Sequence, residues 1–586
     1  MSGQKLRVVA LGWQLARHQP IRFAVGAALW IIWWASPVLV GLALQAVFDA
    51  IAGRQPAKPG LGALLALLVA VEASRLTVFY AGVVMWSWWW GCAETLLRTN
   101  MLRAQLASGG PEAGRPLVGS GSAVAVFRDD ANDFVRFVDT WVDLAGAVLF
   151  AALAVPVMLR VDTTVTLVAV VPLAGAYLAT RLLTERLRSY RRAEREAASQ
   201  VTGFLGSLFS SVLAVKVAGA EAAVVQRLRT LNHMRKEAAL RDQLLTDSMD
   251  AFNGSTVDLT IGLVLLLIAP AMRAGTFTVG ELVLFSSYIT TLAALPRWAG
   301  RLFARHRQAQ VAASRMAELM PARDATGVVA HRRLRLEEQP DTTTRYRPAV
   351  IRPVPVQIRG LGYRFAGGQG VTGIDLDLPA GSFTVVCGPI GSGKTTLLRA
   401  LLGLLHPAEG AVRWDGRVVT DLAAHMIPPR CAYLPQVPKL FSASLRDNLT
   451  LGVATAEDAL AATVRRAALD GDVERMADGL DTMIGPRGVR LSGGQIQRAA
   501  TARALLGDPA LLVLDDLSSA LDAETERLLW ARLLDAREAA HPTCLVVSHR
   551  TAALERADQI VLLDAGRIRA AGTLDELRSA GLDPLA

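Results

Sequence analysis

The stretch Gly388-Pro-Ile-Gly-Ser-Gly-Lys-Thr-Thr396 decides the fold of the C-terminal part of the chain. It follows a short apolar, β-branched run, Ser382–Cys387, and precedes a helical pattern, Leu397–Leu405. A glycine-rich loop between a strand and a helix can wrap its backbone amides around phosphate groups at the positive end of the helix. We therefore predict a nucleotide phosphate site formed by Gly388, Pro389, Ile390, Gly391, Ser392, Gly393, Lys394, Thr395 and Thr396.

Two side chains of this loop and one distant carboxylate predict a magnesium nucleotide as the ligand. Lys394 adds a positive charge at the β and γ phosphates, and the Thr395 hydroxyl can ligate Mg²⁺. A second apolar strand, Leu511–Asp515, ends in a carboxylate. Parallel strands end at one edge of a sheet, so Asp515 is expected beside Thr395 as a second metal ligand. The expected fold here is an α/β P-loop NTPase domain that binds ATP and Mg²⁺.

The residues before 310 have a different composition. Of the 586 residues of the chain, 52% are hydrophobic, and the mean hydropathy of +0.33 is too high for an ordinary soluble protein. A helix that crosses a bilayer needs about 20 mostly apolar residues. A short segment, Leu11–Gln19, has the composition of a helix that lies along the inner interface. Six longer stretches after it are predicted to span the membrane: Ile21–Ile51, Leu61–Trp90, Phe134–Met158, Thr163–Leu183, Phe252–Met272 and Val279–Leu302.

The distribution of basic residues predicts the orientation of these spans. The formal net charge is +10, and the segment Arg181–Arg195 alone carries six arginines. Arginines also flank the other long loop, between the second and third spans, so both long loops are expected on the cytoplasmic side. We predict a multi-pass protein of the cell inner membrane, with both termini and the NTPase domain in the cytoplasm. Because the arginines cluster beside apolar runs, the charge favours a membrane partner and argues against nucleic acid.

Three ionisable residues lie inside the predicted spans. Glu72 and Arg75 are one turn apart in the second span, where an unpaired charge would be costly. They are expected to pair with each other or to line a wet cavity. Asp258 is a single carboxylate in the fifth span, and both a structural hydrogen bond and a functional role remain open for it.

The pentapeptide Leu491-Ser-Gly-Gly-Gln495, between the glycine-rich loop and the Asp515 strand, makes the resemblance specific. A signature of this kind, with six spans ahead of it, resembles the exporter-type, multidrug-like half-transporters of the ATP-binding-cassette (ABC) family. The resemblance implies an all-α six-helix transmembrane domain followed by an α/β nucleotide-binding domain. The expected organisation is an interfacial segment at 1–20, a transmembrane domain at 21–310, a linker at 311–355 and a nucleotide-binding domain at 356–586.

Other motifs of the family occur in the expected order, and the resemblance implies their roles. Tyr363 matches the aromatic residue that stacks on adenine, and Gln436 matches the glutamine that reaches the magnesium ion. His549 matches the histidine that contacts the γ-phosphate, and Ser518–Asp522 matches a loop that crosses the dimer. The signature residues implied to bind nucleotide on the partner subunit are Ser492, Gly493, Gly494 and Gln495.

One position departs from the family pattern. The residue after the magnesium-binding aspartate is normally a glutamate that orients or deprotonates the attacking water, and here it is Asp516. Aspartate draws the carboxylate back by one methylene, and a misplacement of about 1 Å can cost on the order of 10²-fold in rate. ATP hydrolysis at this chain's own site is therefore expected to be weak, with Asp516 and His549 as its catalytic residues. This asymmetry favours a heterodimer with a second half-transporter; a slowly hydrolysing homodimer remains the alternative.

The function implied by the resemblance is ATP-driven transport. Dimerisation of two nucleotide-binding domains around ATP would switch the membrane domain between inward-facing and outward-facing states. Export of a hydrophobic or amphipathic small molecule or peptide is the leading interpretation. Import through the same fold, as in siderophore-handling relatives, is the alternative, and the sequence does not identify the transported substrate.

Overall fold

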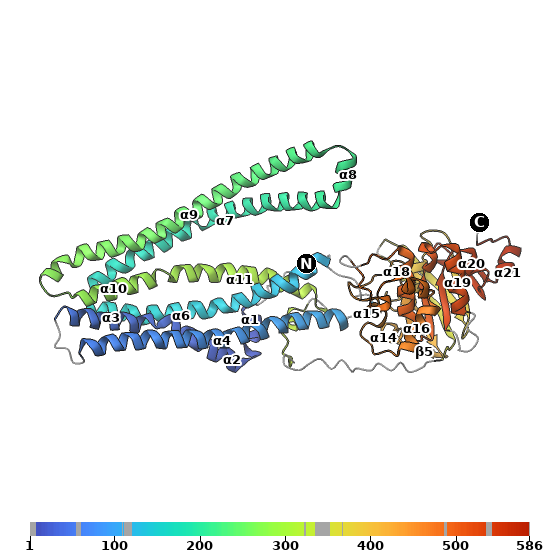
Figure 1. Ribbon diagram of the computed structural model, residues 1–586, viewed down its shortest axis with the longest axis horizontal. Coiled ribbons are helices and arrows are strands. Elements are labelled where there is room, and N and C mark those ends of the chain that lie inside the picture. Colours follow the sequence, from blue (N-terminus) through green and yellow to red (C-terminus); the bar gives the residue numbers. More distant parts are fainter. Residues whose placement is uncertain are drawn as a thin grey trace. The chain divides into compact units, whose positions relative to one another are not determined.

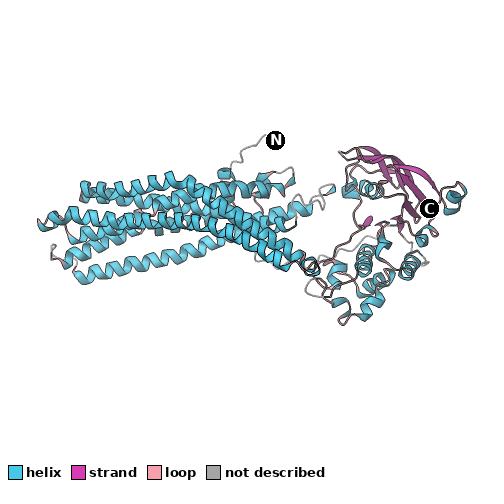
Figure 2. Cartoon of the chain, turned by 90° about the horizontal axis from the view of Figure 1, so that it is seen from above, coloured by secondary structure: helices cyan, strands magenta, loops and turns pink. Residues whose placement is uncertain are grey.

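The computed structural model describes residues 8–53, 60–107, 109–110, 120–321, 324–334, 352–365, 367–485, 489–534 and 542–584. These residues belong to two compact units. One unit is drawn from Met1–Leu102 and Val118–Leu334, and the other from Arg103–Leu117 and Arg335–Ala586. The described elements of the first unit are all helices, whereas the strands belong to the second (Figure 2).

The first unit contains the long helices that the apolar stretches predict (Figure 1). Residues of the predicted interfacial segment form α1, with Val8, Leu11 and Leu15 buried and Trp13 exposed. Pro37 follows a one-residue break between α2 and α3, consistent with the restraint that proline places on the residue before it. The helices are α1 (Val8–Arg17), α2 (Pro20–Ala35), α3 (Pro37–Ile51), α4 (Leu61–Ala107), α5 (Ser120–Ala125), η2 (Val126–Asp130), α6 (Ala131–Val161), α7 (Thr163–Ser210), α8 (Val212–Val217), α9 (Glu221–Arg273), α10 (Val279–Leu292), α11 (Leu295–Glu318) and α12 (Ala325–Val328).

Several of these helices can cross a membrane by length and apolar composition. Among the residues that the structure describes, five stretches qualify: Pro20–Ile51, Leu61–Ala107, Ala123–Val161, Glu221–Arg273 and Val279–Glu318. The predicted span Thr163–Leu183 lies in α7, which contains a shorter apolar stretch, Thr163–Pro172. Helices α7 and α9 run side by side, and α8 joins them at the far end (Figure 1). A helical N-terminal domain with several membrane-capable helices is confirmed, while the number six stays a prediction.

Several polar side chains of this helical unit are paired. Arg75 Nη1 donates to both carboxylate oxygens of Glu72, at 3.0 and 3.1 Å, as the sequence predicts. The indole N–H groups of Trp30 and Trp34 both donate to Asp143, at 3.0 and 3.1 Å. These aromatic residues therefore have a structural role in joining α2 to α6. Asp258 is exposed on the surface of α9 in this chain, so its role stays open.

The second unit contains two sheets. The antiparallel sheet has the order β2-β1-β4-β5, and the larger sheet has the order β10-β9-β3-β8-β7-β6. In the larger sheet, β9, β3, β8, β7 and β6 are parallel neighbours. The strands are β1 (Val356–Arg364), β2 (Gly370–Leu378), β3 (Phe383–Cys387), β4 (Glu409–Trp414), β5 (Arg417–Val418), β6 (Cys431–Leu434), β7 (Leu511–Asp515), β8 (Thr543–Val547), β9 (Gln559–Asp564) and β10 (Arg567–Gly572).

The core of this unit lies on both faces of the larger sheet. All residues of β3, β7 and β8 are buried, as expected for central parallel strands covered by helices. The helices are α13 (Lys394–Leu401), α14 (Leu422–His425), α15 (Leu445–Thr450), α16 (Glu457–Arg466), α17 (Asp470–Arg475), η4 (Gly479–Asp481), α18 (Gly493–Leu505), η5 (Leu517–Ala520), α19 (Ala523–Leu534), α20 (Thr551–Leu554) and α21 (Leu574–Ser579). Four adjacent strands, β3, β8, β7 and β6, end at one edge, and the loops that follow them carry the predicted site residues.

Candidate active site

The glycine-rich loop joins β3 to α13, in the strand–loop–helix arrangement that the sequence predicts. Gly388 has a φ of +141°, and a Cβ atom there would lie 2.0 Å from the carbonyl oxygen of Leu563. Gly393 precedes α13 with a φ of +103°. The Nζ of Lys394 donates to the carbonyl oxygens of Gly388 and Pro389, at 2.8 and 2.9 Å. The lysine is thereby folded over the loop, and burial lowers its pKa.

The two predicted metal ligands of β7 and α13 lie together. The Thr395 hydroxyl donates to Asp515 Oδ1 at 3.2 Å, and the Tyr433 hydroxyl reaches Oδ2 at 3.4 Å. Asp515 is 2% exposed, and its burial raises its pKa. A carboxylate and a hydroxyl at this separation are the hard oxygen donors that Mg²⁺ prefers, so these residues fit the ion that the fold implies. When bound, magnesium would neutralise phosphate charge beside Lys394.

Asp516, the residue that differs from the glutamate of the family pattern, has a left-handed backbone conformation directly after β7. Its φ is +54°, and its backbone N–H donates to the carbonyl oxygen of Val547 on β8 at 3.1 Å. The side-chain amide of Gln436, two residues after β6, donates to Asp516 Oδ2 at 3.3 Å. The structure therefore brings the predicted metal ligand Gln436 and the predicted catalytic carboxylate into contact.

His549 lies two residues after β8. In the larger sheet, β8 lies between β3, which leads into the glycine-rich loop, and β7, which ends at Asp515. Its side chain is exposed at the edge where these strands end. The preceding residue, Ser548, is buried, and its N–H donates to the carbonyl oxygen of Val386 at 3.3 Å. The backbone around His549 is thus fixed to the strand that leads into the phosphate loop.

Tyr363 lies near the end of β1, in the antiparallel sheet. It pairs with Val371 of β2, and a Cβ atom at Gly393 would lie 2.8 Å from the side chain of Val371. This pairing places the tyrosine close to the phosphate loop. Phe365 packs edge-to-face on Tyr363 with ring centroids 4.9 Å apart, and it is 46% exposed.

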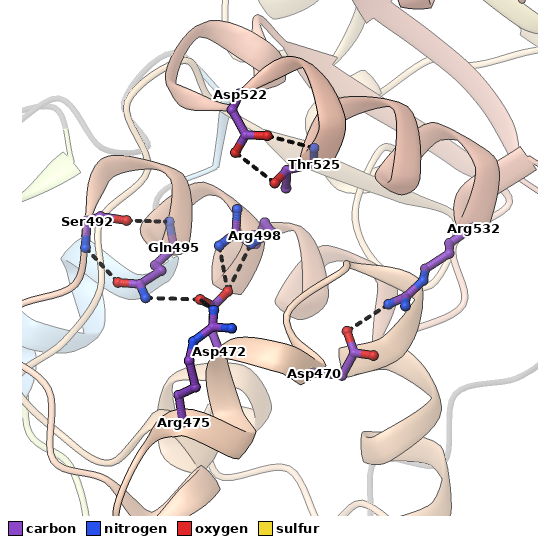
Figure 3. A network of polar contacts seen from close by, with 9 residues as sticks. All are labelled: Asp470, Asp472, Arg475, Ser492, Gln495, Arg498, Asp522, Thr525 and Arg532. Carbon is purple, nitrogen blue, oxygen red and sulfur yellow. Dashed lines mark hydrogen bonds and ion pairs between the residues drawn. The ribbon is translucent and has the colours of Figure 1, made fainter.

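The signature pentapeptide begins α18. The Ser492 hydroxyl accepts from the Gln495 N–H at 3.2 Å, and Gln495 Oε1 accepts from the Ser492 N–H at 2.8 Å, forming a reciprocal cap. The side-chain amide nitrogen of Gln495 donates to Asp472 Oδ1 at 3.0 Å (Figure 3). A Cβ atom at Gly494 would lie 2.9 Å from the carbonyl oxygen of Ala520.

Asp472 of α17 is the centre of this network (Figure 3). It also accepts from the guanidinium of Arg498 on α18 and from Arg475 at 2.8 Å. Its side chain is 4% exposed. Burial alone would raise the pKa of Asp472, but the hydrogen bonds from Gln495 and Arg498 hold it below its ordinary value. The charged form of this carboxylate therefore fixes the first turn of the signature helix.

The predicted site residues form two groups. The phosphate loop, Thr395, Gln436, Asp515 and Asp516 meet at one sheet edge, with His549 in the loop after the neighbouring strand. Among the residues that the structure describes, the recorded hydrogen bonds of Ser492 and Gln495 lead to each other and to Asp472, away from the phosphate loop. The signature residues are therefore held by a set of contacts that is separate from that of the phosphate loop.

Sequence reasoning missed Tyr433 and Asp472. The position of Tyr433, three residues before Gln436 on a predicted strand, was a usable signal, because strand ends carry the site. Asp472 offered no such signal, since Gln495 and Arg498 lie 23 and 26 residues away in the chain.

Comparisons with known proteins agree with this geometry. The sequence pattern of the ABC transporter family matches residues 371–519. The chain is 32% identical over 419 residues to an ATP-dependent lipid A-core flippase of Chromohalobacter salexigens, covering 71% of this chain and 69% of that protein. It is 30% identical over 434 residues to the flippase of Chromobacterium violaceum, covering 72% and 70%.

A solved structure extends the likeness to the whole fold. A bacterial Atm1-family ABC exporter with ATP bound matches with a TM-score of 0.72 and 23% identity, covering 95% of this chain and 97% of the other. These relatives are flippases and an exporter, which does not favour the alternative of an importer. The chain belongs to the ABC transporter family, as an exporter-type half-transporter that couples ATP hydrolysis to transport across a membrane.

Proposed function

We propose that this chain is one subunit of a dimeric exporter that moves an amphipathic, lipid-like molecule with an anionic head group out of the inner membrane. The observation that carries the substrate class is a cavity of about 640 Å³ inside the helical unit. The lining residues come from four helices and are Pro37, Val40, Arg75, Ile261, Leu265, Leu282, Val283, Ser286, Ser287, Thr290 and Thr291.

The cavity combines an apolar wall with one cation and a row of hydroxyls. Arg75 has its Nη1 on Glu72, while its buried Nε has no hydrogen-bond partner among the described residues. The guanidinium has five N–H donors. An anionic head group can therefore accept hydrogen bonds from Arg75 in place of Glu72 or together with it. Ionisable residues in membrane helices are costly, and those that occur pair with one another, face a wet cavity or mark a substrate path. The names of the flippase relatives agree with an amphipathic substrate.

In the proposed cycle, ATP lies between the phosphate loop of one subunit and the signature of the other. Lys394 and the loop amides hold the phosphates, with Thr395, Asp515 and Gln436 around the magnesium ion. Asp516 orients the attacking water or takes its proton, and His549 contacts the γ-phosphate. Tyr363 stacks on the adenine, and Ser492, Gly493, Gly494 and Gln495 complete the partner's site. Binding of ATP favours the closed dimer of nucleotide-binding domains, and hydrolysis of ATP allows that dimer to open.

A heterodimer is the assembly that we propose. The shortened carboxylate of Asp516 makes this chain's own site slow, whereas its capped signature helix can complete a fully active site on a partner half-transporter. A homodimer remains the alternative. Domain limits at 20, 310 and 355, and a cytoplasmic position of both termini, are part of the same proposal. Part of the proposed linker, residues 335–351, lies outside the described residues.

The test is transport by the purified full-length protein, with any co-purifying half-transporter, in vesicles that contain fluorescent lipids with anionic or zwitterionic head groups. ATP-dependent movement of the anionic lipid is expected, and Arg75→Gln should reduce it while leaving ATPase activity without substrate unchanged. Ser74→Ala, adjacent in the chain but not among the cavity-lining residues, is the matched control. Equal movement of both lipids, or an Arg75→Gln variant that transports normally, would contradict the proposed substrate class.

A further inference from the structure

Asp515, a proposed ligand of the magnesium ion, accepts hydrogen bonds from two hydroxyl groups, one at each carboxylate oxygen. The Thr395 hydroxyl donates to Oδ1 at 3.2 Å, and the Tyr433 hydroxyl donates to Oδ2 at 3.4 Å. Thr395 belongs to the phosphate loop and is itself a proposed ligand of the ion. Tyr433 is not among the residues assigned to the nucleotide site, yet its hydroxyl contacts the same carboxylate.

The register of the larger sheet brings this tyrosine to Asp515. Strands β6 and β7 are parallel neighbours, with Tyr433 opposite Val513 and Leu434 opposite Leu514. Successive side chains of a strand alternate between its two faces, so Tyr433, Val513 and Asp515 lie on the same face of the sheet. The hydroxyl, at the far end of the ring, can therefore reach the carboxylate two residues further along β7.

The ring and the hydroxyl of Tyr433 have separate contacts. The ring is half-buried and packs against the hydrophobic core that contains Val513, and phenylalanine would pack there equally well. Arg399, one turn after Thr395 on α13, interacts with the Tyr433 hydroxyl and with the charge of Asp515. A phenolic oxygen can accept from a guanidinium while its proton is donated to a carboxylate. The hydroxyl thus links Arg399 to Asp515.

A donor at Oδ2 controls the direction in which Oδ1 points. The last torsion of an aspartate side chain has a broad, roughly two-fold preference, so a carboxylate that is held at one oxygen can still turn. With Thr395 at Oδ1 and Tyr433 at Oδ2, the plane of the Asp515 carboxylate is fixed. Hydrogen-bonded partners of metal ligands orient those ligands and thereby set the affinity for the metal.

We propose that Tyr433 is a positioning residue for the magnesium site, because its hydroxyl holds the Asp515 carboxylate in the orientation that faces Thr395. Tyr433 acts through Asp515 and is not itself a ligand. The inference rests on the proposed function, in which Thr395 and Asp515 hold the magnesium ion. It adds to that function a residue that sets the affinity for the metal.

The experiment measures the requirement for magnesium rather than the rate of hydrolysis. The full-length protein, with any co-purifying half-transporter, is crosslinked with a photoreactive ATP analogue while Mg²⁺ is titrated, and the labelling of this chain is followed on a gel. Tyr433→Phe should raise the Mg²⁺ concentration for half-maximal labelling by about tenfold, the lower end of the range for hydrogen-bonded partners of metal ligands. Residual labelling in EDTA should be unchanged, because the phosphate loop is intact.

Tyr288→Phe is the matched control. It removes the hydroxyl of another buried tyrosine, which donates to the carbonyl oxygen of Val38 at 2.7 Å in the helical unit. The Mg²⁺ concentration for half-maximal labelling should be the same in this variant as in the wild type, since Tyr288 does not contact Asp515.

Each outcome separates the inference from the function on which it rests. An unchanged half-maximal Mg²⁺ concentration in Tyr433→Phe would overturn the role of the tyrosine and leave the nucleotide site in place. An equal rise in Tyr288→Phe, or a matching loss of labelling in EDTA, would indicate a general defect and would also overturn it. Wild-type labelling that is absent or independent of Mg²⁺ would contradict the proposed magnesium nucleotide site itself, and the inference with it.

Discussion

Asp516 is the residue on which the proposed asymmetry depends. Its backbone is held in the left-handed region by β8, and its carboxylate lies 3.3 Å from Gln436. The backbone cannot move forward to compensate for a short side chain, because its N–H is bonded to Val547. In the role that we propose for Asp516, the missing methylene therefore shifts the carboxylate directly.

Replacing Asp516 by glutamate should raise the ATPase rate of the assembled transporter, by an amount on the order of 10-fold to 10²-fold. The longer side chain returns the carboxylate to the distance that the family uses. Steady-state phosphate release from the purified complex is the measurement, and removal of the partner's glutamate should abolish activity in the wild type. Asp458→Glu, on the exposed first turn of α16, is the control. Unchanged rates in both active-site variants would argue against a degenerate site.

Lys394→Ala should weaken nucleotide binding at this chain's site. The amine is held 2.8 Å from the Gly388 carbonyl, in the loop that is expected to receive the phosphates, and no other described lysine lies in that loop. Crosslinking of the full-length protein with a photoreactive ATP analogue measures the effect. Labelling should fall by about tenfold or more, as loss of a charge-assisted contact implies. Lys236→Ala, on exposed α9, should label normally; normal labelling of Lys394→Ala would refute the role of the lysine.

At the scale of elements, α18 is the helix whose position matters most for the proposed partner site. Its first turn is capped by its own sequence through Ser492 and Gln495. The orientation of this first turn is fixed by Asp472 of α17, which accepts hydrogen bonds from Gln495 and Arg498 of α18. The cap needs only the amide oxygen of Gln495, which leaves the amide nitrogen for Asp472. Asp472 is thus a positioning residue for the signature.

Asp472→Asn should destabilise the motor domain and reduce ATP-driven closure of the dimer. Loss of one partner leaves Arg498 buried with an uncompensated charge, which costs about 3–5 kcal/mol. Thermal unfolding measures the stability, and the ratio of ATPase activity to ATP crosslinking at Lys394 measures the positioning. The ratio should fall, because this chain's phosphate loop is intact while its signature is displaced.

The matched control for this variant lies two residues away. Asp470 pairs with Arg532 at 2.7 Å, with side chains 30% and 32% exposed, so Asp470→Asn should cost only about 0–1 kcal/mol. Since the pKa of Asp472 is lowered in the folded state, its stabilising effect is present at neutral pH. The difference between wild type and Asp472→Asn should therefore shrink as the pH falls below about 4. A pH-independent difference would indicate a packing defect instead.

At the scale of the whole molecule, the orientation of the helical unit is open to a direct test. The four native cysteines are buried, and burial raises the pKa of Cys387 to about 11, so background labelling of thiols should be low. Ala274 follows α9 and is exposed in the short connection to α10, whereas Val217 at the end of α8 is 81% exposed. Val217 precedes α9 in the chain and Ala274 follows it, so these two positions lie at opposite ends of α9.

An impermeant maleimide should label Ala274→Cys in intact cells and Val217→Cys only after the membrane is opened. The positive-inside rule places the arginine-rich ends of α7 and α9 in the cytoplasm. Mass shift of the purified protein measures the labelling. The reverse pattern would invert the proposed topology, and labelling of both positions in intact cells would show that the helices do not separate two compartments.

The sequence by itself determined the features that local physics controls. A glycine-rich loop between an apolar strand and a helix specifies a phosphate site within about twenty residues, and an apolar run of sufficient length specifies a membrane-capable helix. The signature motif then identified the family, because its spacing from the other motifs is specific. The departure at Asp516 was also visible without coordinates.

Only the tertiary structure decided which distant residues meet. Asp472 accepts a hydrogen bond from Gln495, which is 23 residues away in the chain. Asn100 donates a hydrogen bond to Val328, which is 228 residues away. The cavity around Arg75 likewise combines side chains from helices far apart in the chain. Such contacts depend on how helices pack and rotate against one another. That packing is set by many weak, long-range interactions, which leave no periodic pattern around either partner.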